Sequence, residues 1–181
     1  MEDKMIRVAI THGDTNGIGY EVILKTFATP TILELCTPIV YGSPKLAAYH
    51  RKALNLETSF NIIERAEDAC DGKLNILACF DDEVKVELGQ PSEEAGKAAL
   101  MALDRAMTDY RSGLYDVLVT APINKATIQG EGFHFPGHTE YIETCVGEGN
   151  KALMILMNED LRVALVTTHL PIRNVAEAIT Q

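Results

Sequence analysis

The sequence predicts an α/β fold, in which helices cover both faces of a sheet, on three observations. Short continuous apolar runs alternate along the chain with segments whose apolar residues recur at helical spacing. Continuous apolar runs are typical of strands that crossover helices bury on both faces. Hydrophobic residues make up 46% and charged residues 23% of a 181-residue chain that lacks tryptophan, so we expect a folded chain with an aliphatic core.

The first part of the chain contains four apolar runs that predict strands. They cover residues 5–11, 38–41, 60–63 and 74–78. A loop with three glycines, residues 13–19, follows the first strand, and a helix begins near Tyr20. A second helix is predicted over residues 43–54.

A long helix comes next, with clear start and stop signals. Pro91 and Ser92 mark its start, acidic residues occupy its first turn, and Gly113 ends it. Apolar residues recur at helical spacing at Ala99, Leu103, Ala106 and Tyr110. An alanine-rich face predicts close approach to a sheet or a partner helix, through Ala95, Ala98, Ala99 and Ala102.

A central strand is predicted over residues 115–120, and Pro122 ends it. The remaining elements are a short helix, a loop, a helix and two strands, over residues 123–129, 130–137, 138–146, 153–157 and 162–168. The chain ends inside an amphipathic pattern, PIRNVAEAITQ, without a cap or a closing strand. We therefore expect an interrupted domain.

The charge balance and the hydropathy exclude several classes of protein. The 16 basic and 26 acidic residues leave a net charge of −10, which argues against binding to nucleic acid or anionic membranes. The longest stretches without a charged residue, 35–44 and 163–172, are half the length of about 20 residues that a membrane-spanning helix needs. The N-terminus, MEDKMIRVAIT, lacks the regions of a signal peptide, so we expect a cytoplasmic protein.

The cysteines show no C-x-x-C spacing, and no secretory signal precedes them. A cytoplasmic chain keeps its thiols reduced. We therefore expect free, mostly buried thiols rather than disulfides or a zinc site at Cys36, Cys70, Cys79 and Cys145.

The first candidate site is the loop in THGDTNGIGYE, between the first strand and the first helix. Gly13, Gly17 and Gly19 permit positive φ angles and close approach of the backbone, and a helix start offers N–H groups to an anion. The spacing matches neither G-x-G-x-x-G nor a P-loop. A ligand site and a plain strand-to-helix turn are equally open from these residues.

The second candidate is Lys125 in the segment TAPINK, just past the predicted strand over residues 115–120. Ligands of open α/β sheets bind at the carboxyl ends of strands. We expect Lys125 to bind a phosphate or a carboxylate, and a solvated surface lysine is the alternative.

The third candidate is the segment HFPGHTE. His134 and His138 are four residues apart, but Pro136 and Gly137 between them argue against a shared helical face and a zincin-like site. The loop would instead deliver His138 and Thr139 to the first turn of a helix, where an oxyanion fits. The alternative is that one of these side chains only caps the helix.

The fourth candidate is His169, directly after the predicted strand over residues 162–168. Neutral imidazole is a common ligand for divalent transition metals, and a strand end would hold it rigidly. One histidine does not make a metal site. The residues alone favour a structural histidine.

Four segments taken together, THGDTNGIGYE, TAPINK, FPGHTE and RVALVTTHLPIRNVAEAIT, resemble the 4-hydroxythreonine-4-phosphate dehydrogenase family of pyridoxal phosphate biosynthesis. The resemblance covers essentially the whole chain. It implies a three-layer, two-domain α/β homodimer related to isocitrate and isopropylmalate dehydrogenases. Such an enzyme uses NAD and a divalent metal such as zinc, magnesium or cobalt. Family members are twice as long, so residues 1–126 would begin the first domain and residues 127–181 the second.

The resemblance also implies a reaction and roles for residues. The reaction is NAD-dependent oxidation of 4-phosphooxy-L-threonine at C3, followed by decarboxylation to 3-amino-2-oxopropyl phosphate. His169 would be a metal ligand, and His138 and Thr139 would contact the substrate. Two further metal-binding histidines come from later sequence in the family, one of them from the other subunit, so the active site would be shared. Lys125 is a further candidate for the substrate, and the three loop glycines are candidates for the cofactor.

The glycine loop departs from the commoner family form. His12 stands where a proline is usual, Asp14 and Thr15 replace a Glu-Pro pair, and Tyr20 replaces another proline. The glycines themselves remain. The departures therefore bear on the rigidity of the loop more than on the family.

Three alternatives stay open. The first is a dehydrogenase of a related four-carbon phosphorylated acid, of the phosphothreonate type. The second is a metallohydrolase that binds metal tightly through His134, His138, Glu140 and His169. The third is an inert chain, either truncated or regulatory, that binds phosphorylated metabolites. Because metal ligands are missing, we expect the 181-residue chain alone to be inactive.

Overall fold

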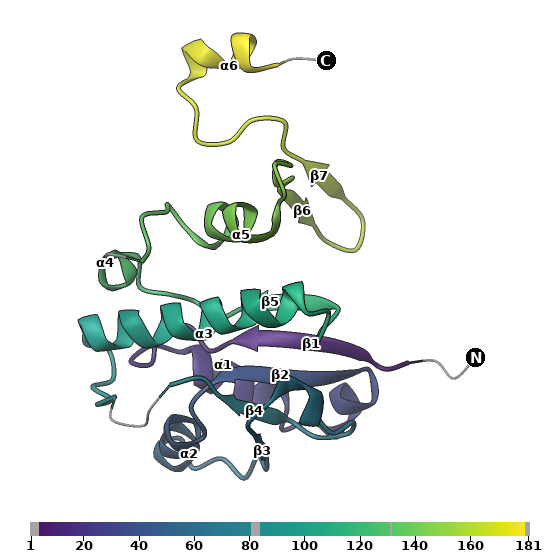
Figure 1. Ribbon diagram of the computed structural model, residues 1–181, viewed down its shortest axis with the longest axis vertical. Helices are drawn as coiled ribbons and strands as arrows, with labels where there is room; N and C mark the ends of the chain where they lie inside the picture. The colour runs from purple at the N-terminus through teal and green to yellow at the C-terminus, as the bar shows by residue number, and fades with distance from the viewer. Residues whose placement is uncertain (1–3, 81–83, 131, 180–181) are drawn as a thin grey trace.

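The computed structural model describes residues 4–80, 84–130 and 132–179, and its main feature is a parallel sheet of five strands (Figure 1). The strands lie in the order β3-β4-β2-β1-β5, and every neighbouring pair is parallel. Their bounds are Ile6–Thr11 for β1, Cys36–Gly42 for β2, Asn61–Ile63 for β3, Asn75–Ala78 for β4 and Val117–Thr120 for β5. The α/β fold predicted from the sequence is confirmed.

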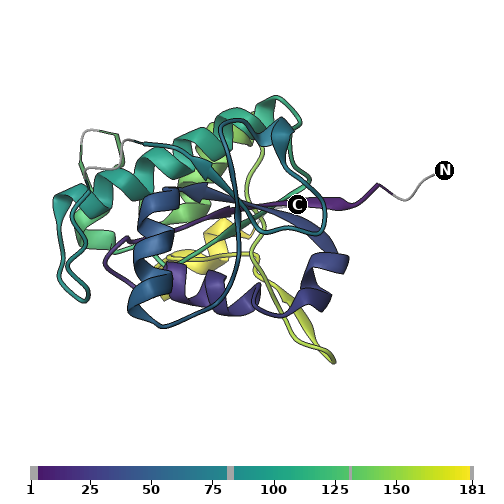
Figure 2. The same cartoon turned by 90° about the horizontal axis from the view of Figure 1, so that it is seen from below.

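Helices cover both faces of this sheet (Figure 1), and Figure 2 shows the same arrangement from below. Helix α3 (Glu93–Arg111) lies on one face, and helices α1 (Gly19–Thr26) and α2 (Pro44–Ala53) lie on the other. Successive side chains of a strand point to opposite faces, so strands inside the sheet, such as β1, β2 and β4, supply both cores. Ala9 packs in the core under α3, and its neighbour Ile10 packs in the core under α1 and α2.

Two short 3₁₀ turns, η1 (Pro30–Glu34) and η2 (Ala66–Asp68), were not predicted from the sequence. Each lies in a connection between longer elements, where the apolar pattern has no period to detect. Neither turn borders the candidate site.

Helix α3 starts as the sequence predicts, and its predicted apolar face is buried except for Tyr110, which is 46% exposed. The Ser92 hydroxyl caps the helix by accepting a hydrogen bond from the N–H of Ala95, and the predicted alanine face is buried. A Cβ at Gly96 would lie 1.9 Å from the carbonyl oxygen of Thr127. Only glycine therefore lets the short helix α4 (Lys125–Ile128) approach α3 so closely.

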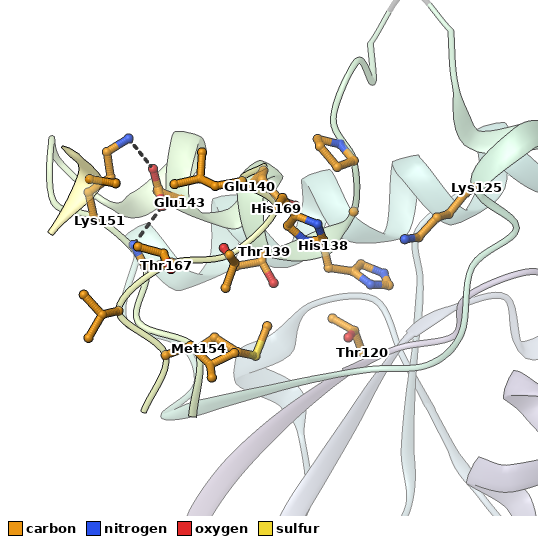
Figure 3. Close-up of a pocket in the computed structure, with 18 of the residues that line it drawn as sticks. Thr120, Lys125, His138, Thr139, Glu140, Glu143, Lys151, Met154, Thr167 and His169 are labelled. Atoms are coloured by element: carbon orange, nitrogen blue, oxygen red, sulfur yellow. Dashed lines mark hydrogen bonds and ion pairs between the residues drawn. The ribbon is translucent and has the colours of Figure 1, made fainter. Parts of the chain in front are cut away.

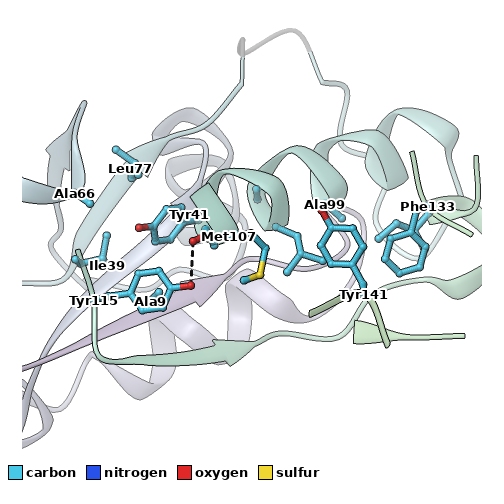
Figure 4. Close-up of a cluster of buried hydrophobic side chains, with 14 of the residues drawn as sticks. Ala9, Ile39, Tyr41, Ala66, Leu77, Ala99, Met107, Tyr115, Phe133 and Tyr141 are labelled. Carbon is cyan, nitrogen blue, oxygen red and sulfur yellow. Dashed lines mark hydrogen bonds between the residues drawn. The ribbon is translucent and has the colours of Figure 1, made fainter. Parts of the chain in front are cut away.

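The core under α3 contains aromatic side chains as well as aliphatic ones (Figure 4), so the expectation of an aliphatic core is wrong here. Tyr41 and Tyr115 are buried edge to face, with ring centroids 6.1 Å apart. The Tyr41 hydroxyl donates a hydrogen bond of 2.9 Å to Asp109. Burial, together with this carboxylate, raises the pKa of Tyr41 well above its usual value.

Strand β5 lies at the edge of the described sheet, so the prediction of a central strand is wrong for these residues. It pairs with β1, and among residues 4–80, 84–130 and 132–179 no other strand pairs with it. Val117 and Val119 are 48% and 47% exposed. An apolar run predicts that a strand can be buried on both faces. It does not predict the position of the strand in the sheet, because that position depends on pairing with strands that are distant in the sequence.

After β5 the chain leaves the sheet (Figure 1). It forms α5 (His138–Val146), an antiparallel hairpin of β6 (Ile155–Met157) and β7 (Arg162–Ala164), and α6 (Ile172–Ala178). The strand predicted over residues 162–168 ends early, because β6 is the only described partner of β7 and the later residues have no strand to bond with. The proposed division into residues 1–126 and 127–181 stays a prediction.

The structure also bears on the expectations for the cysteines and for membrane-spanning helices. All four cysteines are free, as predicted, but Cys70 is exposed and the other three are only half-buried. The thiols are therefore less buried than expected. None of the described helices is both long enough and apolar enough to cross a lipid bilayer.

The loop after β1 is buried and is held by stacked rings. His12 is fully buried, and its Nε2 lies 3.4 Å from the carbonyl oxygen of Ala98. A carbonyl only accepts, so Nε2 carries the proton, and buried Nδ1 has no partner among the described residues. The His12 ring stacks on Tyr20, which stacks on His50, with 5.1 Å between centroids in each pair. Burial lowers the pKa of His12 to about 4 and also lowers the pKa of His50.

We expect His12 to make the fold sensitive to acid. The pKa rises from about 4 in the folded chain to 6.5 on unfolding, so the unfolded state binds the proton first and the free energy of unfolding falls as the pH drops from 6.5 through 4. The loss due to His12 is about 3 kcal/mol. His12→Phe keeps a stacked ring without a titrating nitrogen and should remove this loss in urea unfolding measured across that range.

The matched control is His134→Phe, because His134 is exposed. It should keep the pH dependence of the original chain. Equal pH slopes for His12→Phe and the original chain would contradict the assignment to His12.

Candidate functional site

An open hollow of about 860 Å³ lies at the carboxyl end of β5 (Figure 3). Its walls come from the end of β5, the start of α4, the first turn of α5 and the irregular segment 165–170. Lys125, His138, Thr139 and His169 all line it. The structure thus brings residues from three separate segments of the sequence around one space, at the strand end where open α/β sheets bind ligands.

Lys125 is the first residue of α4, and its side chain is directed into the hollow toward His138 (Figure 3). The Asn124 side chain caps α4 by accepting hydrogen bonds from the N–H groups of Ala126 and Thr127, at 3.0 and 3.3 Å. In the part of the chain that the structure describes, no carboxylate forms an ion pair with Lys125. Its ammonium group is therefore available to an anion.

His138 and Thr139 are the first two residues of α5, as the sequence predicts. Gly137 occupies the cap position, and neither side chain makes a capping hydrogen bond there. The capping alternative is therefore wrong. The first N–H groups of a helix have no partner within it, and here they lie beside an imidazole and a hydroxyl on the wall of the hollow.

His169 lines the hollow but does not follow a strand directly. Strand β7 ends at Ala164, and His169 lies in the irregular segment after it with a φ of +55°. This left-handed conformation is uncommon for a residue with a side chain. The expectation of an imidazole held rigidly at a strand end is therefore wrong for the described residues, and the role of His169 as a metal ligand stays a prediction.

The structure adds a charged pair that the sequence analysis missed. The Lys151 ammonium lies 3.2 Å from Glu143 of α5, whose other oxygen accepts a hydrogen bond of 2.8 Å from the N–H of Ala152. The N–H of Ala152 and the charge of Lys151 lower the pKa of Glu143. Both charged residues line the hollow, yet they neutralise one another. Glu143 and Lys151 are eight residues apart in the sequence, and this separation matches no helical spacing that would have predicted an ion pair.

The donor set for a metal is incomplete in this structure. Within residues 4–80, 84–130 and 132–179, no three His, Cys, Asp or Glu side chains gather as metal ligands. His134 is exposed and does not line the hollow with His138 and His169. The metallohydrolase built on His134, His138, Glu140 and His169 is therefore not supported.

Packing explains two of the loop glycines. A Cβ at Gly13, whose φ is +75°, would lie 2.3 Å from the carbonyl oxygen of Pro122, and one at Gly19 would lie 2.0 Å from that of His12. The loop also uses backbone N–H groups internally, since those of Asn16 and Gly17 donate to Asp14. None of the three glycines lines the hollow. A contact between this loop and a cofactor stays a prediction.

Electrostatics keep His138 neutral. The imidazole is half-buried, and its burial lowers its pKa, with a further lowering from the positive charge of Lys125. A neutral imidazole next to a free ammonium group and helix N–H groups can donate one hydrogen bond and accept another. The hollow therefore suits a ligand with an anionic group and hydroxyl groups.

Both the sequence and the fold match known proteins. The sequence model of the family described as pyridoxal phosphate biosynthetic protein PdxA matches residues 34–181. A Bacteroides thetaiotaomicron protein named 4-hydroxythreonine-4-phosphate dehydrogenase is 64% identical over 181 residues, all of this chain and 50% of that protein. A Cupriavidus necator protein named D-threonate 4-phosphate dehydrogenase is 32% identical over 173 residues, 94% of this chain and 51% of that protein.

The fold is also that of a solved relative. The crystal structure of a 4-hydroxythreonine-4-phosphate dehydrogenase from Burkholderia phymatum matches with a TM-score of 0.83 and 32% identity, over 97% of this chain and 53% of that one. The chain thus spans about half the length of the relatives it matches.

We expect Lys125→Met to raise the pKa of His138, because the neighbouring positive charge is lost. Burial remains, so the pKa should stay below 6.5. Titration of the His138 ring proton signals by NMR measures both values. Lys97→Met, a change at an exposed lysine of α3 away from the hollow, is the matched control and should leave this titration unchanged. An unchanged pKa in Lys125→Met would show that the two groups do not interact.

Proposed function

Because the chain belongs to the PdxA family of pyridoxal phosphate biosynthetic proteins, we propose that it forms the first half of an NAD-dependent 4-hydroxythreonine-4-phosphate dehydrogenase. The observation that carries the proposal is the hollow in which Lys125, His138 and Thr139 meet at the start of α5. Lys125 supplies a positive charge to this hollow without an ion-pair partner among the described residues, and Glu140 of α5 places a carboxylate on the same wall. A phosphorylated substrate fits the Lys125 ammonium group together with the N–H groups of the first turn of α5.

The proposed reaction has two steps. The C3 hydroxyl of 4-phosphooxy-L-threonine loses its proton, and its C3–H passes as a hydride to NAD, which gives a β-keto acid and NADH. The C1–C2 bond then breaks, CO₂ leaves, and a proton added at C2 gives 3-amino-2-oxopropyl phosphate. The protein's part is to bind and orient the substrate and to hold the reacting carbon against the nicotinamide.

We assign the phosphate to the start of α5. The N–H groups of its first turn and the Thr139 hydroxyl would donate hydrogen bonds to the phosphate oxygens, and Lys125 would neutralise part of their charge. His138, kept neutral by burial and by Lys125, would donate a hydrogen bond from one ring nitrogen. These contacts fix one end of the substrate and leave its reacting end in the open part of the hollow.

Our proposal of a divalent metal and NAD as cofactors rests on the family resemblance. His169 would supply one ligand of a divalent metal, and the other ligands would have to come from outside the described residues. Such a metal supplies Lewis acidity to the oxygen at C3. The loop with Gly13, Gly17 and Gly19 is the candidate for contact with NAD. We further propose a cytoplasmic homodimer whose subunits share the active site.

A second substrate of the same class deserves a test. A relative at 32% identity is named D-threonate 4-phosphate dehydrogenase, and its substrate carries the same terminal phosphate but a hydroxyl in place of the amino group. In this proposal the hollow binds the phosphate end, which both substrates share. The 64% identity to a protein named for the amino acid substrate favours that substrate here.

The proposal is tested with a chimaera in which this chain replaces the matching half of the Bacteroides thetaiotaomicron relative. We expect NAD reduction with 4-phosphooxy-L-threonine in the presence of a divalent metal, and none from the 181-residue chain alone. 4-Phospho-D-threonate is assayed in parallel. Absence of turnover with both substrates, in a folded chimaera, would overturn the proposed function.

Three histidine variants of the chimaera separate the roles of the residues. His169→Ala should abolish metal-dependent turnover with little loss of stability, because the side chain is exposed. His138→Asn should raise KM and lower kcat, each by about tenfold. His134→Asn is the matched control and should change neither constant. Activity retained in His169→Ala would refute the metal assignment.

A further inference from the structure

Helix α5 carries the residues assigned to the phosphate, and it packs against the core under α3 through Tyr141, Ile142, Cys145 and Val146. Tyr141 is buried, whereas the other residues of α5 are half-buried or exposed. Its ring stacks on Phe133 with 5.3 Å between centroids and meets Phe135 edge to face at 5.4 Å. Figure 4 shows Phe133 and Tyr141 together at one end of the core under α3. The loop before α5 and the helix itself are therefore packed around this tyrosine.

The Tyr141 hydroxyl reaches beyond the core to α3. It donates a hydrogen bond to a carboxylate oxygen of Asp104. Burial, together with this bond, raises the pKa of Tyr141 well above its usual value, so the phenol stays protonated and remains a donor. At the far end of α5, Arg111 of α3 donates a hydrogen bond of 2.6 Å to the carbonyl oxygen of Cys145.

Helix α3 thus sets the position of both sides of the hollow. It holds α4, which begins with Lys125, through the close contact at Gly96, and it holds α5 through Asp104. Tyr141 lies three residues after His138, within one turn of the helix start. A shift of the tyrosine would therefore move His138 and Thr139 relative to Lys125.

We propose that Tyr141 is a positioning residue of the candidate site, and that its hydrogen bond to Asp104 holds the start of α5 opposite Lys125. The identity of the ligand rests on the proposed function, but the anchoring of α5 does not. A phosphate bound between two helices needs both at a fixed separation, because charge-assisted hydrogen bonds weaken steeply with distance and angle. The pair Tyr141 and Asp104 supplies this constraint at a site that does not touch the ligand.

Substitutions at Asp104 separate positioning from core packing. Asp104 is on the exposed side of α3, so Asp104→Leu removes the acceptor, leaves the Tyr141 ring in place and keeps good helix propensity. Asp104→Asn keeps an oxygen that can accept the hydrogen bond. Tyr141→Phe removes the donor from the other side. Thr144→Val is the matched control, because it removes an exposed hydrogen bond within α5 itself.

The first measurement uses hydrogen exchange on the 181-residue chain. We expect amide exchange in α5 to quicken about tenfold in Asp104→Leu and in Tyr141→Phe, and to stay near the original rate in Asp104→Asn and Thr144→Val. Amides of β1 and β2 serve as an internal reference for global stability. If α5 exchanges at the original rate in both anchor variants, the proposal is overturned whatever the enzyme does.

The second measurement uses the chimaera and 4-phosphooxy-L-threonine. We expect KM to rise about fivefold or more in Asp104→Leu while kcat changes less than KM, and we expect rescue by Asp104→Asn. An unchanged KM in Asp104→Leu, with turnover intact, overturns the positioning role. If the chimaera shows no turnover, the proposed function fails, and the exchange experiment still decides whether Tyr141 anchors α5.

Discussion

The close packing of α3 against both the sheet and helix α4 is the constraint on which the rest of the structure depends. Small side chains make it possible: buried alanines face the strands, and Gly96 admits the backbone of α4. A larger side chain at Gly96 would meet the carbonyl of Thr127, so α4 would have to move and would carry Lys125 with it. The shape of the hollow therefore follows from residue size on a helix that does not line it.

Much of the fold could be predicted because its signals are local. Neighbouring residues in the sequence determine the cap at Ser92, the alanine face of α3 and the helix start at His138. The structure contains all three at the predicted positions. Two other features show what local signals miss. The edge position of β5 and the early end of β7 depend on which strands pair with them, and pairing is decided by distant segments.

The candidate site also contains some residues that local sequence signals predict and others that they do not. Lys125 and His169 could be selected because each follows an apolar run, and His138 and Thr139 because a loop with proline and glycine leads into a helix start. All four residues line the same hollow. The ion pair of Lys151 with Glu143 and the anchor at Tyr141 escaped notice, since surface charges and core aromatics carry no distinctive spacing. For Gly13 and Gly19 the structure supplies a packing reason, while their proposed contact with a cofactor rests on resemblance.

The hairpin of β6 and β7 has a consequence for handling this chain in solution. Its apolar side chains are largely exposed, including Leu156 at 59% and Met157 at 67%, and its outer backbone groups have no described partner. Open strand edges with apolar side chains template intermolecular pairing. We therefore expect the isolated polypeptide to self-associate through this hairpin as its concentration rises.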